Sequence, residues 1–278
     1  MIIRVGYDVM FQVPARTTML LVLYTHPSRA ASLRAADQVH VEPDVPVEVY
    51  TDPFGNRCAR IVAPPGKLRL WNMTLVEDSG VPDEVRVSAQ QQPVENLPPD
   101  VLPFLLGSRY CDVDKLTDVA WSLFGQTQLG WPRVQAVCDW VHQNVKFGYQ
   151  FASPLKSAAD VYQQRTGVCR DFNHLALTFC RCLGIPARYA TGYLGDIGVP
   201  ASSSPMDFSG WFEAYLDGRW FTFDARHNTP RIGRVLMARG KDAVDVAITT
   251  SFGPTYLEKF VVFTDQVPEP QPTAVAWR

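Results

Sequence analysis

The chain has 278 residues, of which 46% are apolar and 19% are charged, and its formal net charge is −2. This length accommodates one large domain or two smaller ones, each with a substantial core. The balanced charge gives no electrostatic reason to expect nucleic acid or an anionic membrane as a partner. No apolar run approaches the roughly 18 residues of a membrane span, and the first residues lack a signal-peptide pattern. Because the six cysteines are dispersed and suit reduced thiols, we expect a cytoplasmic protein.

The first 85 residues are predicted to form an all-β domain. Short extended segments recur at regular spacing, separated by proline and glycine turns, as is typical of a β-sandwich or barrel. Residues 86–108 are rich in proline and are predicted to be a linker, and residues 268–278 a loose tail. The predicted strands of the front domain are 2–12, 17–25, 47–51, 57–63 and 67–76.

Residues 109–267 are predicted to form a core of helices and strands, which makes the whole chain α+β. The dipeptide Asp217-Gly218 between two alternating segments predicts a hairpin with a type I′ turn. Two later segments, 244–251 and 257–264, are expected to complete the same sheet. The other predicted elements are helices at 112–124, 131–145, 158–164 and 169–184, and strands at 188–194, 208–216 and 219–223.

Cys169 is the candidate nucleophile. It follows a glycine turn and begins a helix that carries one apolar stripe and ends at Gly184. The positive end of a helix dipole stabilises a thiolate, and the neighbouring Arg170 is expected to act in the same direction. The other five cysteines are interpreted as small buried apolar residues.

Four short motifs resemble the bacterial transglutaminase-like superfamily, in order and in spacing. They are 167–171, 183–188, 211–215 and 220–224. The resemblance covers about residues 110–265, and the all-β segment resembles the N-terminal region often joined to this core. It implies a papain-like fold and a Cys-His-Asp triad, in which Cys169 matches the nucleophile and Asp224 the acid. The family's histidine lies two residues before a tryptophan, where this chain has Ser209.

The register of the hairpin shows what Ser209 means for the triad. If Leu216 pairs with Arg219, Trp211 lies opposite Asp224, and Ser209 shares their face of the sheet. A histidine at position 209 would reach Asp224, whereas serine is too short and cannot accept a proton near neutral pH.

Two other histidines are candidates for the missing base. His227 follows Asp224 by three residues. Strict strand register places His227 on the opposite face, in a structural role, but a turn there would bring its ring back as a replacement base. His174 lies about 140° round the helix from Cys169 and is expected to face away from the thiol.

Two functions remain open at this point. In the first, the chain is an enzyme: Cys169 attacks an amide of a protein or peptide substrate, and the thioester is then released to an amine or to water. Backbone donors at the helix start would hold the oxyanion with Tyr149 as a candidate partner, and Tyr149 and Trp211 are the expected substrate contacts. In the second, the loss of the base leaves a catalytically altered or inactive binding or assembly module. No cofactor and no metal is expected, because no acidic loop with calcium-ligand spacing is present, and the oligomeric state is not predicted.

Overall fold

Alternating apolar residues build the first part of the chain as two antiparallel four-stranded sheets packed face to face. The computed structural model describes residues 1–201 and 205–268, and its sheets have the strand orders β14-β1-β6-β3 and β13-β2-β5-β4. The predicted all-β front of an α+β fold is confirmed. The strands are β1 (Ile2–Val13), β2 (Thr17–Leu21), β3 (His40–Glu42), β4 (Glu48–Thr51), β5 (Arg57–Ala63), β6 (Gly66–Glu77), β13 (Thr249–Ser251) and β14 (Tyr256–Val267).

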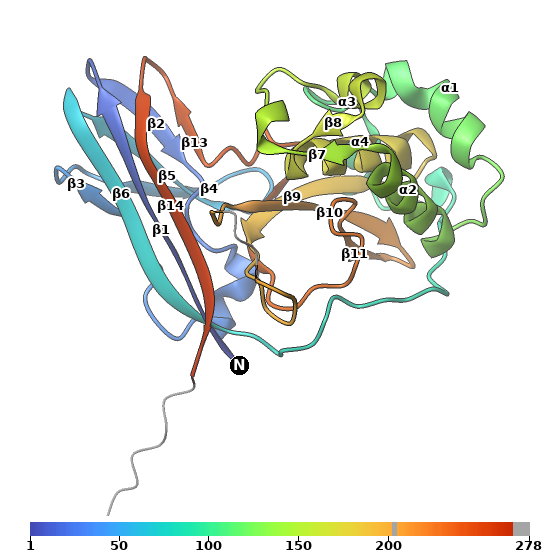
Figure 1. Ribbon diagram of the computed structural model, residues 1–278, viewed down its shortest axis with the longest axis horizontal. Coiled ribbons are helices and arrows are strands. Elements are labelled where there is room, and N and C mark those ends of the chain that lie inside the picture. The colour runs from blue at the N-terminus through green and yellow to red at the C-terminus, as the bar shows by residue number, and fades with distance from the viewer. Residues whose placement is uncertain (202–204, 269–278) are drawn as a thin grey trace, which may run out of the picture.

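The last two strands belong to this sandwich. β14 pairs with β1 from Ile2 opposite Val267 to Gln12 opposite Tyr256, and β13 pairs with β2. Figure 1 shows the red β14 beside the blue β1. The prediction that residues 244–251 and 257–264 complete the core sheet is therefore wrong. Periodicity identifies a strand, but it does not say which sheet supplies the free edge that the strand joins.

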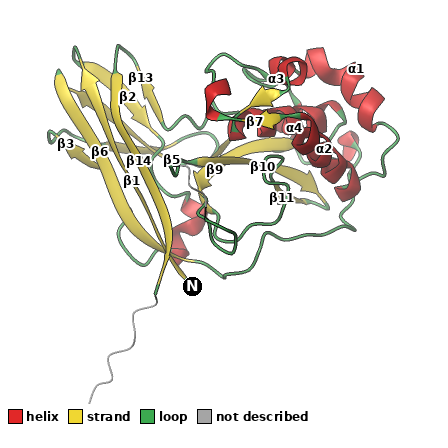
Figure 2. Cartoon of the chain, in the orientation of Figure 1, coloured by secondary structure: helices red, strands yellow, loops and turns green. Residues whose placement is uncertain are grey.

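The second part packs helices on one face of another antiparallel sheet, of strand order β11-β10-β9-β12 (Figure 2). The predicted hairpin is confirmed, with Leu216 opposite Arg219 and positive φ angles at Asp217 and Gly218. β12 was not predicted. The elements are α1 (Val113–Phe124), α2 (Trp131–Asn144), β7 (Lys146–Phe147), α3 (Ala158–Gln164), β8 (Thr166–Gly167), α4 (Cys169–Cys182), β9 (Ala187–Tyr193), β10 (Ser209–Leu216), β11 (Arg219–Phe223) and β12 (Val235–Gly240).

The helix that begins at Cys169 lies at the centre of this part and is buried on every side. From Asp171 to Cys182 every residue is buried, so the single apolar stripe expected from the sequence understates its burial. Its polar side chains are accommodated because each finds a partner. The Arg181 guanidinium, for example, donates to the carbonyl oxygens of Ala187 and Leu106. A helix that carries polar side chains can be buried on all sides only when those side chains find hydrogen-bond partners.

The two parts are joined by more than the chain connection. The side-chain amide of Asn56, in a turn of the sandwich, donates to the backbone oxygen of Arg239 and accepts from its nitrogen, and so caps the edge strand β12. The proline-rich segment is also held against the core: Gln90 N donates to Asp217 and the Gln91 amide to Leu183 O. Within residues 1–201 and 205–268, no helix is long and apolar enough to cross a membrane.

Candidate active site

The sequence around Cys169 places its thiol at the first turn of α4. Val168 is extended, and its N–H donates to Asp171 Oδ2 (2.9 Å), so the helix begins at Cys169. Gly167 is required here because a Cβ atom would lie 2.6 Å from the Cβ of Asp171. The turn and cap together fix the cysteine at the sheet side of the helix start.

The electrostatics of Cys169 differ from the sequence-based expectation. Arg170 pairs with Asp171 Oδ1 (3.0 Å). Burial raises the pKa of the Cys169 thiol, while the charge of Arg226 and a hydrogen bond from the Gly210 backbone act in the opposite direction. The expectation of a lowered pKa is therefore wrong: burial raises it, and Arg170 is not among the groups that act on it. A protonated thiol requires a base in order to attack.

Asp224 and His227 form a hydrogen-bonded pair in the turn that follows β11. Nδ1 of His227 lies 2.8 Å from Asp224 Oδ2. Because a carboxylate only accepts, Nδ1 carries the proton, which leaves Nε2 with a free lone pair. The backbone N–H groups of Arg226 and His227 donate to Asp224 Oδ1 (3.0 and 3.2 Å) and hold the turn closed. The turn thus brings the imidazole back to Asp224, as the alternative to strict strand register required.

A buried arginine supports Asp224 from the other side. Arg234 donates to Asp224 Oδ2 (3.1 Å) and to Asp83 Oδ2 (2.8 Å), and Asp83 lies in the segment that crosses from the sandwich. Burial raises the pKa of Asp224, but the hydrogen bond from His227 and the charge of Arg234 outweigh it and hold that pKa well below its usual range. Trp211 was expected to contact the substrate, but it is only 2% exposed. The Arg234 guanidinium lies over it, 5.0 Å from the centroid of the Trp211 ring.

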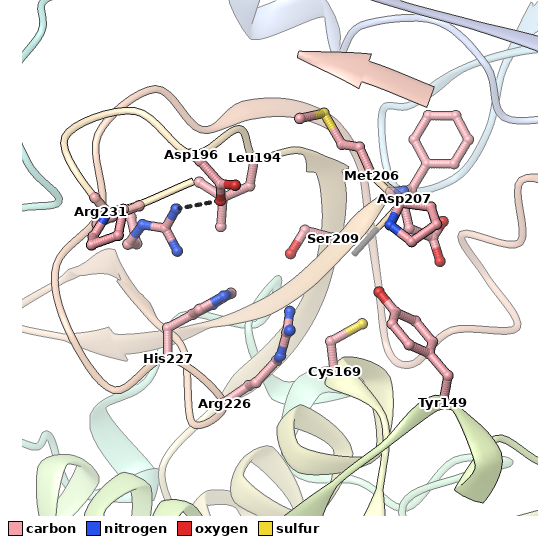
Figure 3. A pocket seen from close by; sticks show the side chains of 14 residues that line it. Tyr149, Cys169, Leu194, Asp196, Met206, Asp207, Ser209, Arg226, His227 and Arg231 are labelled. Atoms are coloured by element: carbon pink, nitrogen blue, oxygen red, sulfur yellow. Dashed lines mark hydrogen bonds and ion pairs between the residues drawn. The ribbon is translucent and has the colours of Figure 1, made fainter. Parts of the chain in front are cut away.

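A cavity of about 300 Å³ joins these groups (Figure 3). Cys169, His227, Ser209 and Tyr149 all line it, and Arg226 stands between Cys169 and His227. Among the described residues no hydrogen bond joins His227 to Cys169. Ser209, the first residue of β10, lies beyond the paired part of the β10–β11 hairpin, which begins at Phe212 opposite Phe223. Within residues 1–201 and 205–268, no group of three or more His, Cys, Asp or Glu side chains could hold a metal ion.

Comparisons with known proteins place this geometry in a family. Residues 123–225 match the model described as the transglutaminase-like superfamily. A structure described as a "Putative Cysteine Protease" from Cytophaga hutchinsonii is 31% identical, with a TM-score of 0.83, and the match covers 97% of this chain and 92% of that one. The chain belongs to the transglutaminase-like superfamily. The predicted family and its α+β fold are confirmed.

Two further matches are more distant. An uncharacterised protein of Mycobacterium leprae is 29% identical over 138 residues, which are 47% of this chain and 49% of that protein. This chain therefore spans about half the length of the curated relative it matches. The periplasmic domain of TgpA from Pseudomonas aeruginosa is 14% identical with a TM-score of 0.40, over 81% of this chain and 90% of that one.

Asn173 links three elements of this transglutaminase-like site and was missed from the sequence. Its side-chain nitrogen donates to Cys169 O (2.9 Å) and to Gly210 O (2.8 Å), and its oxygen accepts from Ala225 N (3.1 Å). It thereby ties α4 to β10 and to the Asp224 turn. An asparagine four residues after Cys169, and so on the same face of the helix, is the signal that could have found it.

His174, by contrast, is structural, as predicted. Its Nε2 accepts from Ala243 N (3.1 Å), and its ring stacks on Tyr110 with centroids 5.0 Å apart. Burial lowers the pKa of His174, which keeps the ring neutral.

Cys169 also borders a larger groove between the core and the sandwich, of about 610 Å³. Tyr110 and Tyr189 line it from the core, and Phe260 of β14 and Thr250 of β13 line it from the sandwich. The sandwich thus supplies one wall of the groove beside the thiol. The sequence could not show this, because it depends on β13 and β14 joining the sandwich.

Proposed function

We propose that this protein is a cysteine enzyme that cleaves or transfers an amide acyl group of a protein or peptide through a thioester on Cys169. Asp224 and His227 act as the base in place of the histidine expected at position 209. The observation that carries the proposal is the 2.8 Å hydrogen bond from His227 Nδ1 to Asp224 in a ring that lines the cavity of Cys169. That bond fixes the tautomer with a free Nε2.

The reaction proceeds in two halves. Cys169 Sγ bonds to the amide carbon, and the thiol proton passes to His227 Nε2 through the cavity, by way of one water. The carbon–nitrogen bond then breaks, and the amine leaves with the proton from Nε2. In the second half, His227 takes a proton from water or from an acceptor amine. That nucleophile bonds to the carbonyl carbon, the carbon–sulfur bond breaks, and the proton returns from Nε2 to the sulfur.

The surroundings of the thiol suit this chemistry. Backbone N–H groups at the start of α4 and at Gly210 are the donors nearest the thiol, and Tyr149 lines the same cavity. Preorganised donors of this kind stabilise the oxyanion. Ser209 has no acid–base role in the proposal, and Trp211 supports Arg234 from below. We also propose that the protein is located in the cytoplasm.

A second candidate is a binding module without turnover. Ser209 in the expected place of the base and the raised pKa of the Cys169 thiol favour it. Such a protein would hold a peptide in the groove between the core and the sandwich.

A pooled peptide library separates the two. Amide cleavage, or hydroxamate formation with hydroxylamine, is followed by mass spectrometry for the wild type, Cys169→Ala and His40→Gln, since His40 lies in the sandwich far from the site. The proposal predicts turnover in the wild type and His40→Gln and none in Cys169→Ala. Peptide retention without turnover in the wild type supports the binding module, and turnover in Cys169→Ala contradicts the enzyme mechanism.

A further inference from the structure

Arg226 is held rigidly beside the candidate nucleophile. Its backbone nitrogen donates to Asp224 Oδ1 (3.0 Å), and its carbonyl oxygen accepts from His142 Nδ1 (2.8 Å). Its guanidinium lies over the ring of Phe147, 4.0 Å from the centroid. The backbone of Arg226 and one face of its guanidinium are therefore held before any ligand binds.

The guanidinium itself has no acceptor among the described residues. The neighbouring arginines differ in this respect. Arg231 donates to Gly195 O (2.9 Å), Arg234 to Asp224 and Asp83, and Arg170 to Asp171. Half-buried Arg226 thus presents unused N–H donors to the cavity in which Cys169 lies. A fixed guanidinium edge with free donors is the usual partner of a carboxylate, which it binds through two parallel hydrogen bonds.

Two carboxylates also line this cavity, and Asp207 interacts with the charge of Arg226 without forming an ion pair with it. Asp196 lies 3.8 Å from Arg231. Asp207 accepts from the backbone nitrogen of Phe208 (2.6 Å) and lies on the Tyr149 side of Cys169 (Figure 3). These acidic groups disfavour a doubly charged ligand such as phosphate more than a singly charged one.

We propose that Arg226 binds a carboxylate of the substrate, so that this enzyme prefers peptides with a carboxylate close to the amide that Cys169 attacks. This inference rests on the function proposed above and names its substrate class. The carboxylate is that of a peptide C-terminus or of an acidic side chain. The rest of the peptide lies in the groove between the core and the sandwich, which Cys169 also borders.

Alkylation of Cys169 tests the anchor without any amide turnover. Iodoacetate and iodoacetamide transfer nearly isosteric groups to sulfur with loss of iodide, but only iodoacetate carries a carboxylate. The ratio of the two rates at Cys169, read by peptide mass spectrometry, is compared with the ratio for a small free thiol. We expect the ratio at Cys169 to exceed that of the free thiol by about tenfold, the value of one charge-assisted hydrogen-bonded pair.

Variants separate anchoring from a general effect of charge. Arg226→Gln returns the ratio to that of the free thiol, and Arg226→Lys retains part of it. Arg219→Gln, on the surface beside Glu84, leaves the raised ratio unchanged. A wild-type ratio equal to that of the free thiol overturns the proposal. An equal slowing of both reagents in Arg226→Gln also overturns it, because Arg226 would then act only on the thiolate. A raised ratio in a protein without amide turnover would contradict the proposed function and keep the anchor.

Protection experiments distinguish the two sources of the carboxylate. Acetylated trialanine with a free C-terminus is compared with its carboxamide, and a peptide amide with a central glutamate is compared with its glutamine analogue. Each is tested for slowing the reaction of Cys169 with iodoacetamide. We expect one carboxylate peptide to protect the wild type better than its neutral analogue, but not Arg226→Gln. Equal protection by all four peptides overturns the proposal.

Discussion

Among single residues, the positions of Cys169 and Asp224 were predictable, and the position of His227 beside Asp224 was not. Cys169 begins a helix, and Asp224, which the family resemblance pointed out, directly follows the second strand of a hairpin; both elements are local. His227 depends on a turn of four residues whose closure relies on two backbone hydrogen bonds to Asp224. Arg226 has the same origin, since the same turn directs it into the cavity. The alternation of side chains stops where β11 ends, so it could not decide on which face of the sheet the His227 ring lies.

We expect His227 to be a poor base once the Asp224 carboxylate is replaced by an amide. In Asp224→Asn, the tautomer of His227 is no longer fixed, and Arg234 loses its charged partner. We expect kcat to fall by about 10²–10⁴ with little change in KM. Steady-state kinetics against a cleaved peptide measure this. Asp8→Asn, a paired carboxylate of the sandwich, is the control and is expected to retain wild-type kinetics.

Restoring a histidine at position 209 is not expected to help. Both oxygens of Asp224 already accept from His227 and Arg234 or from the backbone of the turn. Ser209→His therefore adds a ring without a free carboxylate oxygen to orient it. We expect no gain in peptide turnover, and a gain of tenfold or more would show that the site is a decayed triad with its base at position 209.

Among the elements, α4 and the β10–β11 hairpin form the scaffold of the site, and one asparagine joins them. The sequence predicted both elements with their bounds nearly correct, because their periodicities are strong. It did not predict that α4 is buried on all sides, because burial of Arg181 and His174 depends on acceptors and donors from distant segments. β12 was missed for a related reason: this edge strand of six residues depends on hydrogen bonds to the distant Asn56 turn, which a local sequence pattern does not show.

Asn173→Ala tests the link between these elements. It leaves Gly210 O and Ala225 N without their partner, which costs about 1–3 kcal/mol of unfolding free energy. We also expect kcat to fall while KM changes little, because the Asp224 turn is no longer tied to the Cys169 helix. Thr178→Val is the matched control, since its buried hydroxyl donates to His174 O within the same helix and makes no bond to Gly210 or to the Asp224 turn. Equal kinetic effects in both variants would contradict a positioning role.

Across the whole molecule, the sandwich and the core are built as one structure. The chain returns through β14 to the first strand, and Asp83 reaches from the connecting segment to Arg234, which also bonds to Asp224. The sequence predicted two parts and a linker between them. It could not predict their contacts, because these depend on long-range pairing such as that of Ile2 with Val267.

The junction is expected to weaken in acid. Burial, with a contribution from Arg239, lowers the pKa of His26 to about 4, and the His26 backbone nitrogen bonds to Leu236 O of β12. Histidine in the unfolded chain gains its proton near pH 6.5, so the unfolded state binds more protons between pH 6.5 and 4, and stability falls over that range. We expect the unfolding free energy to drop from pH 7 to pH 5 by about 1–2 kcal/mol more in the wild type than in His26→Asn. Urea unfolding at both pH values measures this, with the exposed His40→Gln as a control that keeps the wild-type slope.

The most direct test of the central claim is the rate at which Cys169 becomes acylated in a single turnover, measured by rapid quench and intact mass with a cleaved peptide. If the Asp224–His227 pair is the base, His227→Ala slows acylation by about 10²–10⁴. Added imidazole then restores a large part of the rate, whereas it has no effect on the wild type or on Cys169→Ala. Acylation of His227→Ala at the wild-type rate, or a loss that imidazole does not relieve, would contradict the account.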